Sequence, residues 1–247
     1  ADPTFDVEGI DAAHKLTIMA SIAFGIPLQF DKAYTEGISK VAQEDVKYAA
    51  ELGYIIKHLG ITKQTDKGVE LRVHPTLIPR RRLIANVDGV MNAVLVKGDA
   101  VGPTLYYGAG AGSEATASAV VADIVDVVRV LTTDSENRVP HLAFQPDAIV
   151  ARPILPISEV VTSYYLRIRT DDEPGVLADI TRILAEQKIS IEAILQKAPE
   201  DHNDGVVPVI MLTQAVVEKN MDLAIKHIEA LTTVKEPVMR IRMESLG

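Results

Sequence analysis

Residues 164–169, YYLRIR, and the turn that follows at 172–175, DEPG, decide the fold of the last third of this chain. The alternation of side chains in YYLRIR predicts a strand, and the residues after the turn place apolar side chains at helical spacing. We expect, in chain order, a strand at 164–169, a helix at 176–187, a strand at 189–196, a polar loop at 199–205, a strand at 206–213, a helix at about 216–231 and a strand at 238–243. This order predicts a βαββαβ unit, in which two helices cover one face of an antiparallel sheet.

The N-terminal part mixes helical and strand patterns less regularly. Helices are expected at 9–24, 43–52 and 114–131, and strands at 54–63, 69–77, 91–97 and 102–107. Turn sequences after these strands favour an antiparallel sheet with helices. The proline-rich stretch 140–156 fits neither a helix interior nor a central strand. We therefore expect an α+β fold with three parts: an antiparallel-sheet domain at 1–140, a partly packed connector at 141–160 and a ferredoxin-like domain at 161–247.

The composition excludes several classes of protein. The 247 residues include no cysteine, 47% are hydrophobic, and the formal net charge is −9. A chain this apolar is not a disordered tail, and its acidic balance argues against nucleic-acid binding. Without cysteine it has no disulfide, and its histidines lack metal-ligand spacing, so no metal site is expected. No apolar run is long enough to span a membrane, and the acidic start is unlike a signal peptide, so we expect a cytoplasmic protein.

Charged residues gather in the first fifteen positions and are absent from residues 16–29. A helix that starts near Gly9 places Asp11 and Lys15 four residues apart on one face. Because that face continues into Ile18 and Ile22, we expect the pair at the rim of a buried helix, with the lysine partly desolvated. A lysine beside carboxylates can transfer a proton while the carboxylates hold a cationic substrate group. Spacing alone favours the alternative, a capping cluster with an ordinary ion pair.

A glycine-rich turn at 108–112 leads from a strand into the helix that contains Thr116. Backbone N–H groups at such a turn, including those around Gly110 and Gly112, can face an anion. The turn is not the dinucleotide fingerprint, because Ser113 stands where a third glycine would be needed. The alternative is a tight turn with close helix packing, and the pattern favours neither.

Residues 2–16, DPTFDVEGIDAAHKL, closely resemble the catalytic segment of homoserine dehydrogenases, and 53–57 and 86–94 continue the match. The resemblance implies an enzyme that reduces L-aspartate 4-semialdehyde to L-homoserine with NADPH or NADH. It gives Lys15 a role in proton transfer at the substrate oxygen. Asp11 would orient the substrate hydroxyl or a water, and Asp6 would contact the substrate amino group.

The same resemblance assigns the glycine turn to the cofactor. In this family Gly110, Gly112 and Thr116 would lie near the nicotinamide end, although Ala115 stands where the family usually has proline. The family also places a nucleotide-binding domain before the position of Asp2. We therefore expect this chain alone to bind NADP or NAD weakly and to show no dehydrogenase turnover.

Residues 172–180, DEPGVLADI, resemble the entry to the first helix of ACT domains, which regulate amino-acid metabolism. Gly175 permits a tight turn, the N–H groups from Val176 onward can hold a carboxylate, and Asp172 could accept from an ammonium. The resemblance adds Gln196 to this effector site and implies threonine as the effector, with sites between ACT domains of a homodimer or tetramer. For these residues the alternative is a plain turn followed by a core strand. For the whole chain the alternative is a module that only senses an amino acid and assembles oligomers.

Overall fold

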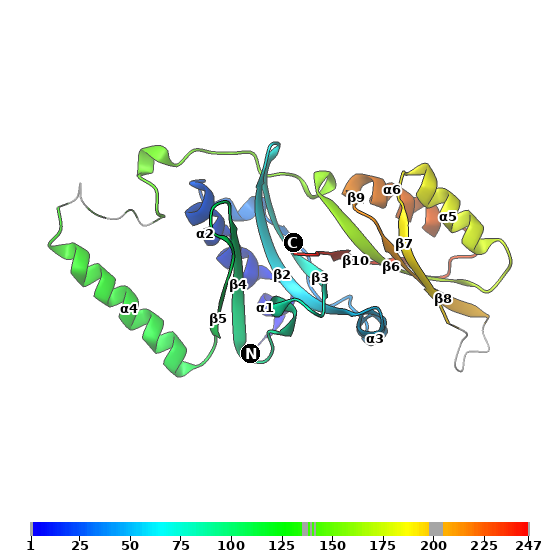
Figure 1. The fold of residues 1–247 in the computed structure, drawn as a ribbon, viewed down its shortest axis with the longest axis horizontal. Coiled ribbons are helices and arrows are strands. Elements are labelled where there is room, and N and C mark those ends of the chain that lie inside the picture. The colour runs from blue at the N-terminus through cyan, green and yellow to red at the C-terminus, as the bar shows by residue number, and fades with distance from the viewer. Residues whose placement is uncertain (1, 135–137, 139, 141, 198–204, 247) are drawn as a thin grey trace.

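The computed structural model describes residues 2–134, 138, 140, 142–197 and 205–246, with N- and C-terminal modules joined by a long connector (Figure 1). The N-terminal module has helices α1 (Thr4–Val7), α2 (Ile10–Phe24), α3 (Gln43–Glu51) and α4 (Ser113–Leu131), and strands β1 (Tyr34–Thr35), β2 (Tyr54–Thr65), β3 (Gly68–Pro79), β4 (Met91–Gly98) and β5 (Gly102–Ala109). The C-terminal module has β6 (Val161–Asp171), α5 (Val176–Glu186), β7 (Ile191–Gln196), β8 (Val206–Thr213), β9 (Val216–Val217), α6 (Glu218–Glu229) and β10 (Met239–Met243). Short 3-10 helices occupy Phe30–Lys32, Leu83–Asn86, Pro146–Ala148 and Ile157–Glu159.

The C-terminal module has the predicted βαββαβ order with one small addition. Its strands lie in the order β10-β6-β8-β7, all antiparallel. Helices α5 and α6 cover one face over a core that includes Leu166, Ile180 and Met211. Val216 and Val217 form the short strand β9 against β6, so the second helix begins at Glu218. Apart from Gly205, the polar loop expected at 199–205 lies outside the described residues.

The second face of this sheet is covered by the N-terminal module. Tyr165, Ile210 and Ile241 pack there against a layer to which α3 contributes Ala49. The sheet therefore has helices on both faces, although only α5 and α6 belong to its own module. Only one covered face was expected from the sequence, because a local pattern does not reveal that a helix about 120 residues earlier in the chain packs on the other face.

The two modules share one sheet. Strand β3 pairs antiparallel with β2 along its whole length, and it also pairs in parallel with β10. The register places Arg242 opposite Thr76 and Met243 opposite Leu77. The last strand of the C-terminal module is thus an inner strand of an eight-stranded sheet. An unpaired outer edge would leave backbone groups open to other chains, and β3 closes it.

Helix α2 packs on the β2–β3 hairpin through one stripe. Ala13, Leu16 and Ala20 face Val69, Leu71 and Val73 in a compact core. These positions follow the helical period, so the predicted helix forms where its apolar stripe can be buried. Gly60 of β2 faces Leu16, and a Cβ added there would make ordinary van der Waals contact with the Leu16 side chain at 3.4 Å.

The connector and the distal part of the N-terminal module differ in packing. Residues 153–155 hydrogen-bond with Val69, so this end of the connector lies against β3. The β4–β5 hairpin forms a separate two-stranded sheet. Helix α4 has no buried residue and stands apart from the other elements (Figure 1). Several of its apolar side chains are exposed, among them Val120, Val121, Ile124, Val127 and Val128.

Candidate functional site

The structure brings Asp11 and Lys15 together on α2. Lys15 Nζ lies 2.6 Å from Asp11 Oδ2, as the four-residue spacing predicts. The helix starts at Gly9, whose φ of +78° favours glycine, and no side chain caps its first turn. The charged group in the first turn is Asp11 itself, which is favourable at the positive end of a helix. The pair is therefore not part of a side-chain cap.

The expected partial desolvation of Lys15 is wrong for this chain. The Lys15 side chain is 66% exposed, and Ile18 and Ile22 on the same face are also exposed. The buried stripe of α2 lies on the opposite side, at Leu16, Ala20 and their neighbours. The apolar residues beside the pair suggested a core face, but they form an exposed apolar surface around it. An ion pair this exposed contributes little to stability, so folding does not explain its presence.

Asp6 lies on α1, one turn before α2, and its side chain is exposed. Its carbonyl oxygen accepts a hydrogen bond from Gly9 N at 3.1 Å, which fixes the bend between the two helices. His14 fills the space between two rings, with centroids 5.6 Å from Phe5 and 4.0 Å from Phe30. Asp6, Asp11 and Lys15 thus belong to one short helix–bend–helix segment with an aromatic support.

The bend rests on His58 and on residues 34–38. A Cβ at Gly9 would lie 2.8 Å from His58 Cε1 and 3.0 Å from a methyl group of Val73, so only glycine fits. His58 Nε2 hydrogen-bonds to Glu36 O at 2.9 Å. Burial lowers the pKa of His58 below its ordinary value, although the Glu36 carbonyl acts in the opposite direction. A neutral histidine therefore lies beneath the bend.

The glycine turn lies between β5 and α4, as predicted. Gly110 N donates to Val90 O at 3.1 Å, and a Cβ at Gly110 would collide with the Asn92 amide. Gly112 has a φ of +120° and open space around its α-carbon, and no side chain caps the first turn of α4. Thr116 follows in that first turn and is exposed. The turn therefore presents backbone N–H groups to its surroundings.

The residues expected to bind an effector gather at one end of the C-terminal sheet. Gln196, at the end of β7, donates from Nε2 to Asp172 Oδ1 at 3.4 Å across 24 residues. Gly175 caps α5 with a φ of +98°, and Val176 is buried beneath the turn. A carboxylate, an amide and the start of α5, which no side chain caps, are thus adjacent, although Val176 N donates to Glu173 O at 3.4 Å. Strand β7, which carries Gln196, is the outer strand of the sheet.

Sequence reasoning missed a set of buried ion pairs between the modules. Arg167 of β6 binds Asp45 of α3, with 2.7 Å from Nε to Oδ1. Arg242 of β10 binds Glu218 of α6 and also Glu36 of the N-terminal module. The alternation of arginines with apolar residues in β6 and β10 gave a partial signal. Their partners lie more than one hundred residues away in two of these three cases, and no local pattern identifies them.

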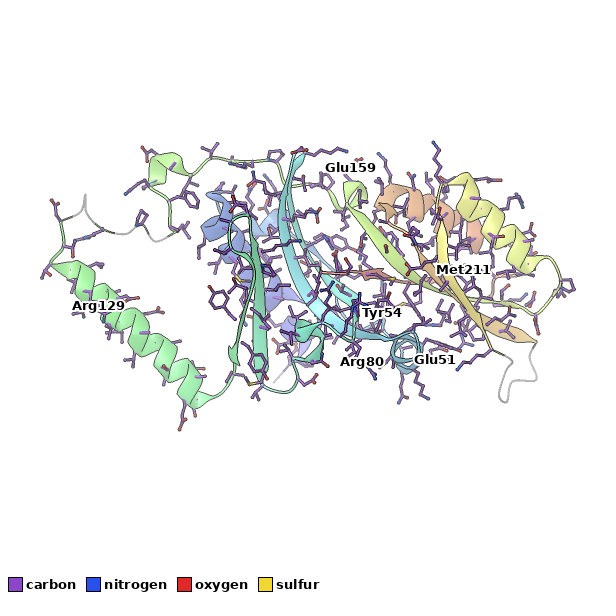
Figure 2. All side chains as sticks on the ribbon, in the orientation of Figure 1. Glu51, Tyr54, Arg80, Arg129, Glu159 and Met211 are labelled. Atoms are coloured by element: carbon purple, nitrogen blue, oxygen red, sulfur yellow. The ribbon has the colours of Figure 1, made fainter. Side chains whose placement is uncertain are left out.

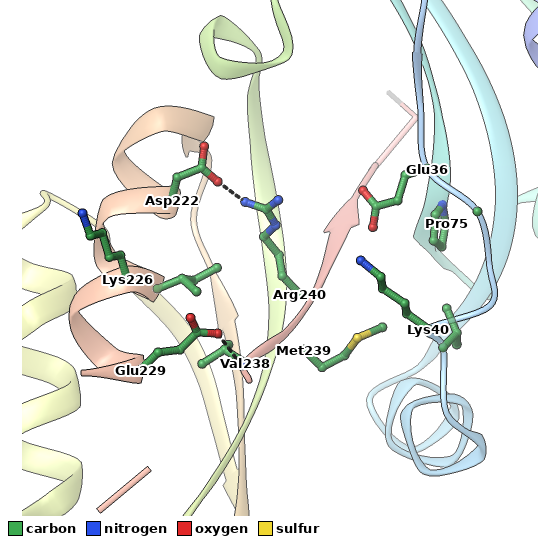
Figure 3. Close-up of a pocket in the computed structure, with 12 residues that line it drawn as sticks. Glu36, Lys40, Pro75, Asp222, Lys226, Glu229, Val238, Met239 and Arg240 are labelled. Carbon is green, nitrogen blue, oxygen red and sulfur yellow. Dashed lines mark hydrogen bonds and ion pairs between the residues drawn. The ribbon is translucent and has the colours of Figure 1, made fainter. Parts of the chain in front are cut away.

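Two clefts lie along this junction. One, of about 280 Å³, is bounded by Glu36, Lys40 and Pro75 on one side and by Asp222, Glu229 and Arg240 on the other (Figure 3). The second, of about 360 Å³, includes Glu8, Tyr34 and Ser39. Most of the charged groups here already have partners: Arg240 binds Asp222, and Glu229 accepts from Val238 N. Asp6, Asp11 and Lys15 line neither cleft.

The described parts of the chain contain neither a candidate metal site nor a candidate membrane span. No group of histidine and acidic side chains there is arranged to hold a metal ion. No helix among them is both long and apolar enough to cross a membrane. Figure 2 shows the described side chains, with Arg129 on the helix α4 that stands apart and Met211 within the C-terminal module.

Comparisons with known proteins agree with the two-part sequence pattern. The family model for homoserine dehydrogenase matches residues 1–125, and the model for the ACT domain matches residues 164–230. A homoserine dehydrogenase of Pseudomonas aeruginosa is 67% identical over 247 residues, which are all of this chain and 57% of that protein. One of Neisseria gonorrhoeae is 58% identical over 246 residues, again 100% of this chain and 56% of the relative.

The solved structures give the same result. The crystal structure of a homoserine dehydrogenase from Thiobacillus denitrificans matches with a TM-score of 0.93 and 66% identity, over all of this chain and 56% of that one. A homoserine dehydrogenase of S. aureus matches with a TM-score of 0.67 and 27% identity, over the same share of this chain and 55% of its own. The chain therefore spans somewhat more than half the length of the relatives it matches.

Proposed function

Because this chain belongs to the homoserine dehydrogenase family, we propose that it is the substrate-binding and regulatory part of such an enzyme. The enzyme would interconvert L-aspartate 4-semialdehyde and L-homoserine in the cytoplasm. The observation that carries this proposal is the Asp11–Lys15 pair, 2.6 Å apart on an exposed helix face of the region that matches the family. An exposed pair is accessible to a substrate and contributes little to folding.

Each residue of the helix–bend–helix segment has a role in this proposal. Lys15 delivers a proton to the substrate carbonyl oxygen during reduction and accepts it during oxidation. Asp11 holds the lysine ammonium and orients the substrate hydroxyl or a water. Asp6, one turn earlier, contacts the substrate amino group. The neutral His58 beneath Gly9 adds no positive charge next to the substrate ammonium.

When bound, a nicotinamide cofactor would supply or accept the hydride at the substrate carbon. The turn at 110–112 fits a contact with one end of it, since the first-turn N–H groups of α4 have no side-chain cap. Gly110, Gly112 and Thr116 would make that contact. They do not enclose a dinucleotide, so most of the cofactor, whether NADP or NAD, would be held by a nucleotide-binding domain. The exposed apolar residues of α4 support the presence of such a covering domain.

The C-terminal module is an ACT domain, and we propose threonine as its effector. Asp172 would accept from the ammonium of the amino acid, and the start of α5 at Gly175 and Val176 would receive the carboxylate. Gln196 would close the site from β7. Because β7 is the outer strand, pairing with a second ACT domain would complete the site and give a homodimer or tetramer.

The dehydrogenase proposal is tested with a chimaera. The nucleotide-binding domain of the Pseudomonas aeruginosa relative is joined to residue 1, and homoserine oxidation with NADP or NAD is followed by absorbance. We expect turnover in the chimaera and none in the isolated chain, because hydride transfer needs the nicotinamide positioned at the reacting carbon. An inactive but folded chimaera would favour the second candidate, a module that only senses an amino acid and assembles oligomers.

Threonine binding is measured separately by calorimetry on the 247-residue chain. We expect saturable binding of threonine and its loss in Gln196→Ala, with Gln187→Ala at the end of α5 as the matched control. If threonine at millimolar concentration produces no heat, the ACT domain serves only assembly.

A further inference from the structure

We propose that Arg242, on the last strand of the C-terminal module, is a positioning residue for the segment that carries Asp6, Asp11 and Lys15. Through it, movements of the ACT domain reach this segment. The hydrogen bonds of Arg242 carry the structural link, and the role of this link in catalysis rests on the proposed function. A linkage of this kind gives the effector site a physical route to the substrate site.

The Arg242 side chain is almost fully buried and bridges the two modules. Its Nε donates to Glu218 Oε2 at 2.8 Å, and one terminal nitrogen binds the other oxygen of the same carboxylate. The second terminal nitrogen donates to Glu36 Oε2 at 2.7 Å. The guanidinium also lies 4.9 Å from the centre of the Tyr34 ring. One guanidinium thus holds a carboxylate of α6 and a carboxylate of the N-terminal module at once.

The surroundings of Arg242 shift the pKa values of its two neighbours Tyr34 and Glu36. Burial raises the pKa of Tyr34 to about 12, although the charge of Arg242 acts against this. Burial alone would raise the pKa of Glu36, but the hydrogen bonds from Arg242 and Tyr34 outweigh it and hold that pKa below its ordinary value. Glu36 and Arg242 therefore remain a charged pair inside the protein. The Arg242 side chain is only 1% exposed, against 26% for Glu36, and a buried charge that loses a partner is strongly unfavourable, so Arg242 holds Glu36 in place.

Glu36 belongs to residues 34–38, which connect directly to the bend between α1 and α2. Ile38 N donates to Val7 O at 3.0 Å, and Glu36 O binds His58 beneath Gly9. Gly37 lies so close to Glu8 that an added Cβ would be 2.9 Å from the Glu8 α-carbon. A displacement of Glu36 therefore changes the support of the bend within one or two residues of Asp6 and Asp11.

On the other side, Glu218 is the first residue of α6, and α6 packs on α5. Helix α5 begins at Gly175, the turn proposed to hold the effector carboxylate. The route is therefore α5, α6, Glu218, Arg242, Glu36 and the bend. Figure 3 shows the neighbouring part of this junction, with Arg240 of β10 directed to Asp222 of α6, and Glu36 on the opposite wall. Each step is a packed helix pair or a hydrogen bond rather than mere proximity.

A second buried arginine provides the control. Arg167 of β6 also crosses between the modules, but it binds Asp45 and Glu44 of α3. Strand β6 also pairs directly with β10. The two arginines therefore share burial, charge and strand location, and they differ in the segment that they hold. Any general effect of loosening the junction would follow from both substitutions.

The test is hydrogen–deuterium exchange, read by mass spectrometry, on the 247-residue chain with Arg242→Lys and Arg167→Lys. Lysine keeps the charge but cannot bind two carboxylates with a planar fork. In Arg242→Lys we expect amides of residues 5–16 to exchange at least fivefold faster, with α3 unchanged. In Arg167→Lys we expect faster exchange in α3 and wild-type exchange at 5–16. Glu36→Gln, which breaks the route without altering the ACT domain, should also accelerate 5–16.

The proposal is overturned if residues 5–16 exchange at the wild-type rate in Arg242→Lys, or if both arginine variants accelerate both segments equally. Glu36→Gln decides the question if Arg242→Lys does not fold. Exchange needs neither turnover nor effector, so this result is independent of the proposed function. A localised change at 5–16 in a chain whose chimaera is inactive would support the link and reject the dehydrogenase.

Discussion

His74, in the middle of β3, is completely buried and keeps a single protonation state. Its Nε2 lies 2.7 Å from Arg72 Nη1 and accepts a hydrogen bond from it, since a guanidinium only donates. Its Nδ1 then carries the proton and lies 3.0 Å from Pro75 O. Burial, together with the charges of Arg242 and Arg72, holds the pKa of His74 well below its ordinary value. The ring is therefore neutral in the folded protein.

This neutral ring makes stability depend on pH with a definite sign. Below about pH 6.5 an unfolded histidine binds a proton, whereas folded His74 stays neutral. As the pH decreases, this residue therefore lowers the free energy of unfolding by as much as about 1.4 kcal/mol per pH unit. We predict that His74→Gln is less stable than wild type at pH 7.5 but loses less stability between pH 6.5 and 5. Urea unfolding at several pH values measures this. The exposed His227→Gln should keep the wild-type slope, and an equal slope in His74→Gln would contradict the account.

At the scale of elements, the bend between α1 and α2 depends on Gly9. It combines a φ of +78° with contact against His58 and Val73, whereas Gly53 has a φ of +83° and open space. Both alanine variants adopt a strained backbone, at a cost of about 1–2 kcal/mol. Only Gly9→Ala adds a collision, so we predict that it lowers the unfolding free energy by about 1–3 kcal/mol more than Gly53→Ala. Equal losses in urea unfolding would show that the contact with His58 is not tight.

Local patterns predicted most helices and strands and failed where partners are distant. The helix expected at 9–24 corresponds to α2, and the spacing of Asp11 and Lys15 predicted their contact. The exposure of Lys15 was missed because apolar residues beside it resemble a core face in a sequence. Short elements such as β1 and β9 have two residues each, too few for a period to be visible.

At the scale of the whole molecule, the shared sheet was not predictable. The pairing of β3 with β10 joins residues about 165 positions apart, and only two residue pairs define it. The strand patterns of β6 and β10 did not indicate that Arg167 and Arg242 are buried beside carboxylates of other elements. The turn at Gly175 was predicted from its own residues, whereas only the resemblance to a known family placed Gln196 beside it; in the structure Gln196 donates to Asp172.

The exposed surfaces of the molecule agree with a chain that functions inside a larger assembly. Ile18 and Ile22 beside Lys15, and the apolar residues of α4, form apolar surfaces that a lone protein rarely leaves open. A domain that covers both would desolvate Lys15 and bring a cofactor to the substrate. Such a cover would give Lys15 the partly desolvated environment expected from the sequence, whereas in this structure its side chain is 66% exposed.

The most direct test of the central claim is kcat for homoserine oxidation in the chimaera with Lys15→Ala. The proposed role of Lys15 in proton transfer predicts a fall in kcat of about 10²- to 10⁴-fold, with unchanged KM for the cofactor and unchanged stability. Lys47→Ala, which removes another exposed helical lysine, should leave kcat unaltered. If Lys15→Ala retains the kcat of the unmodified chimaera, the Asp11–Lys15 pair is not the proton-transfer group and the account is wrong.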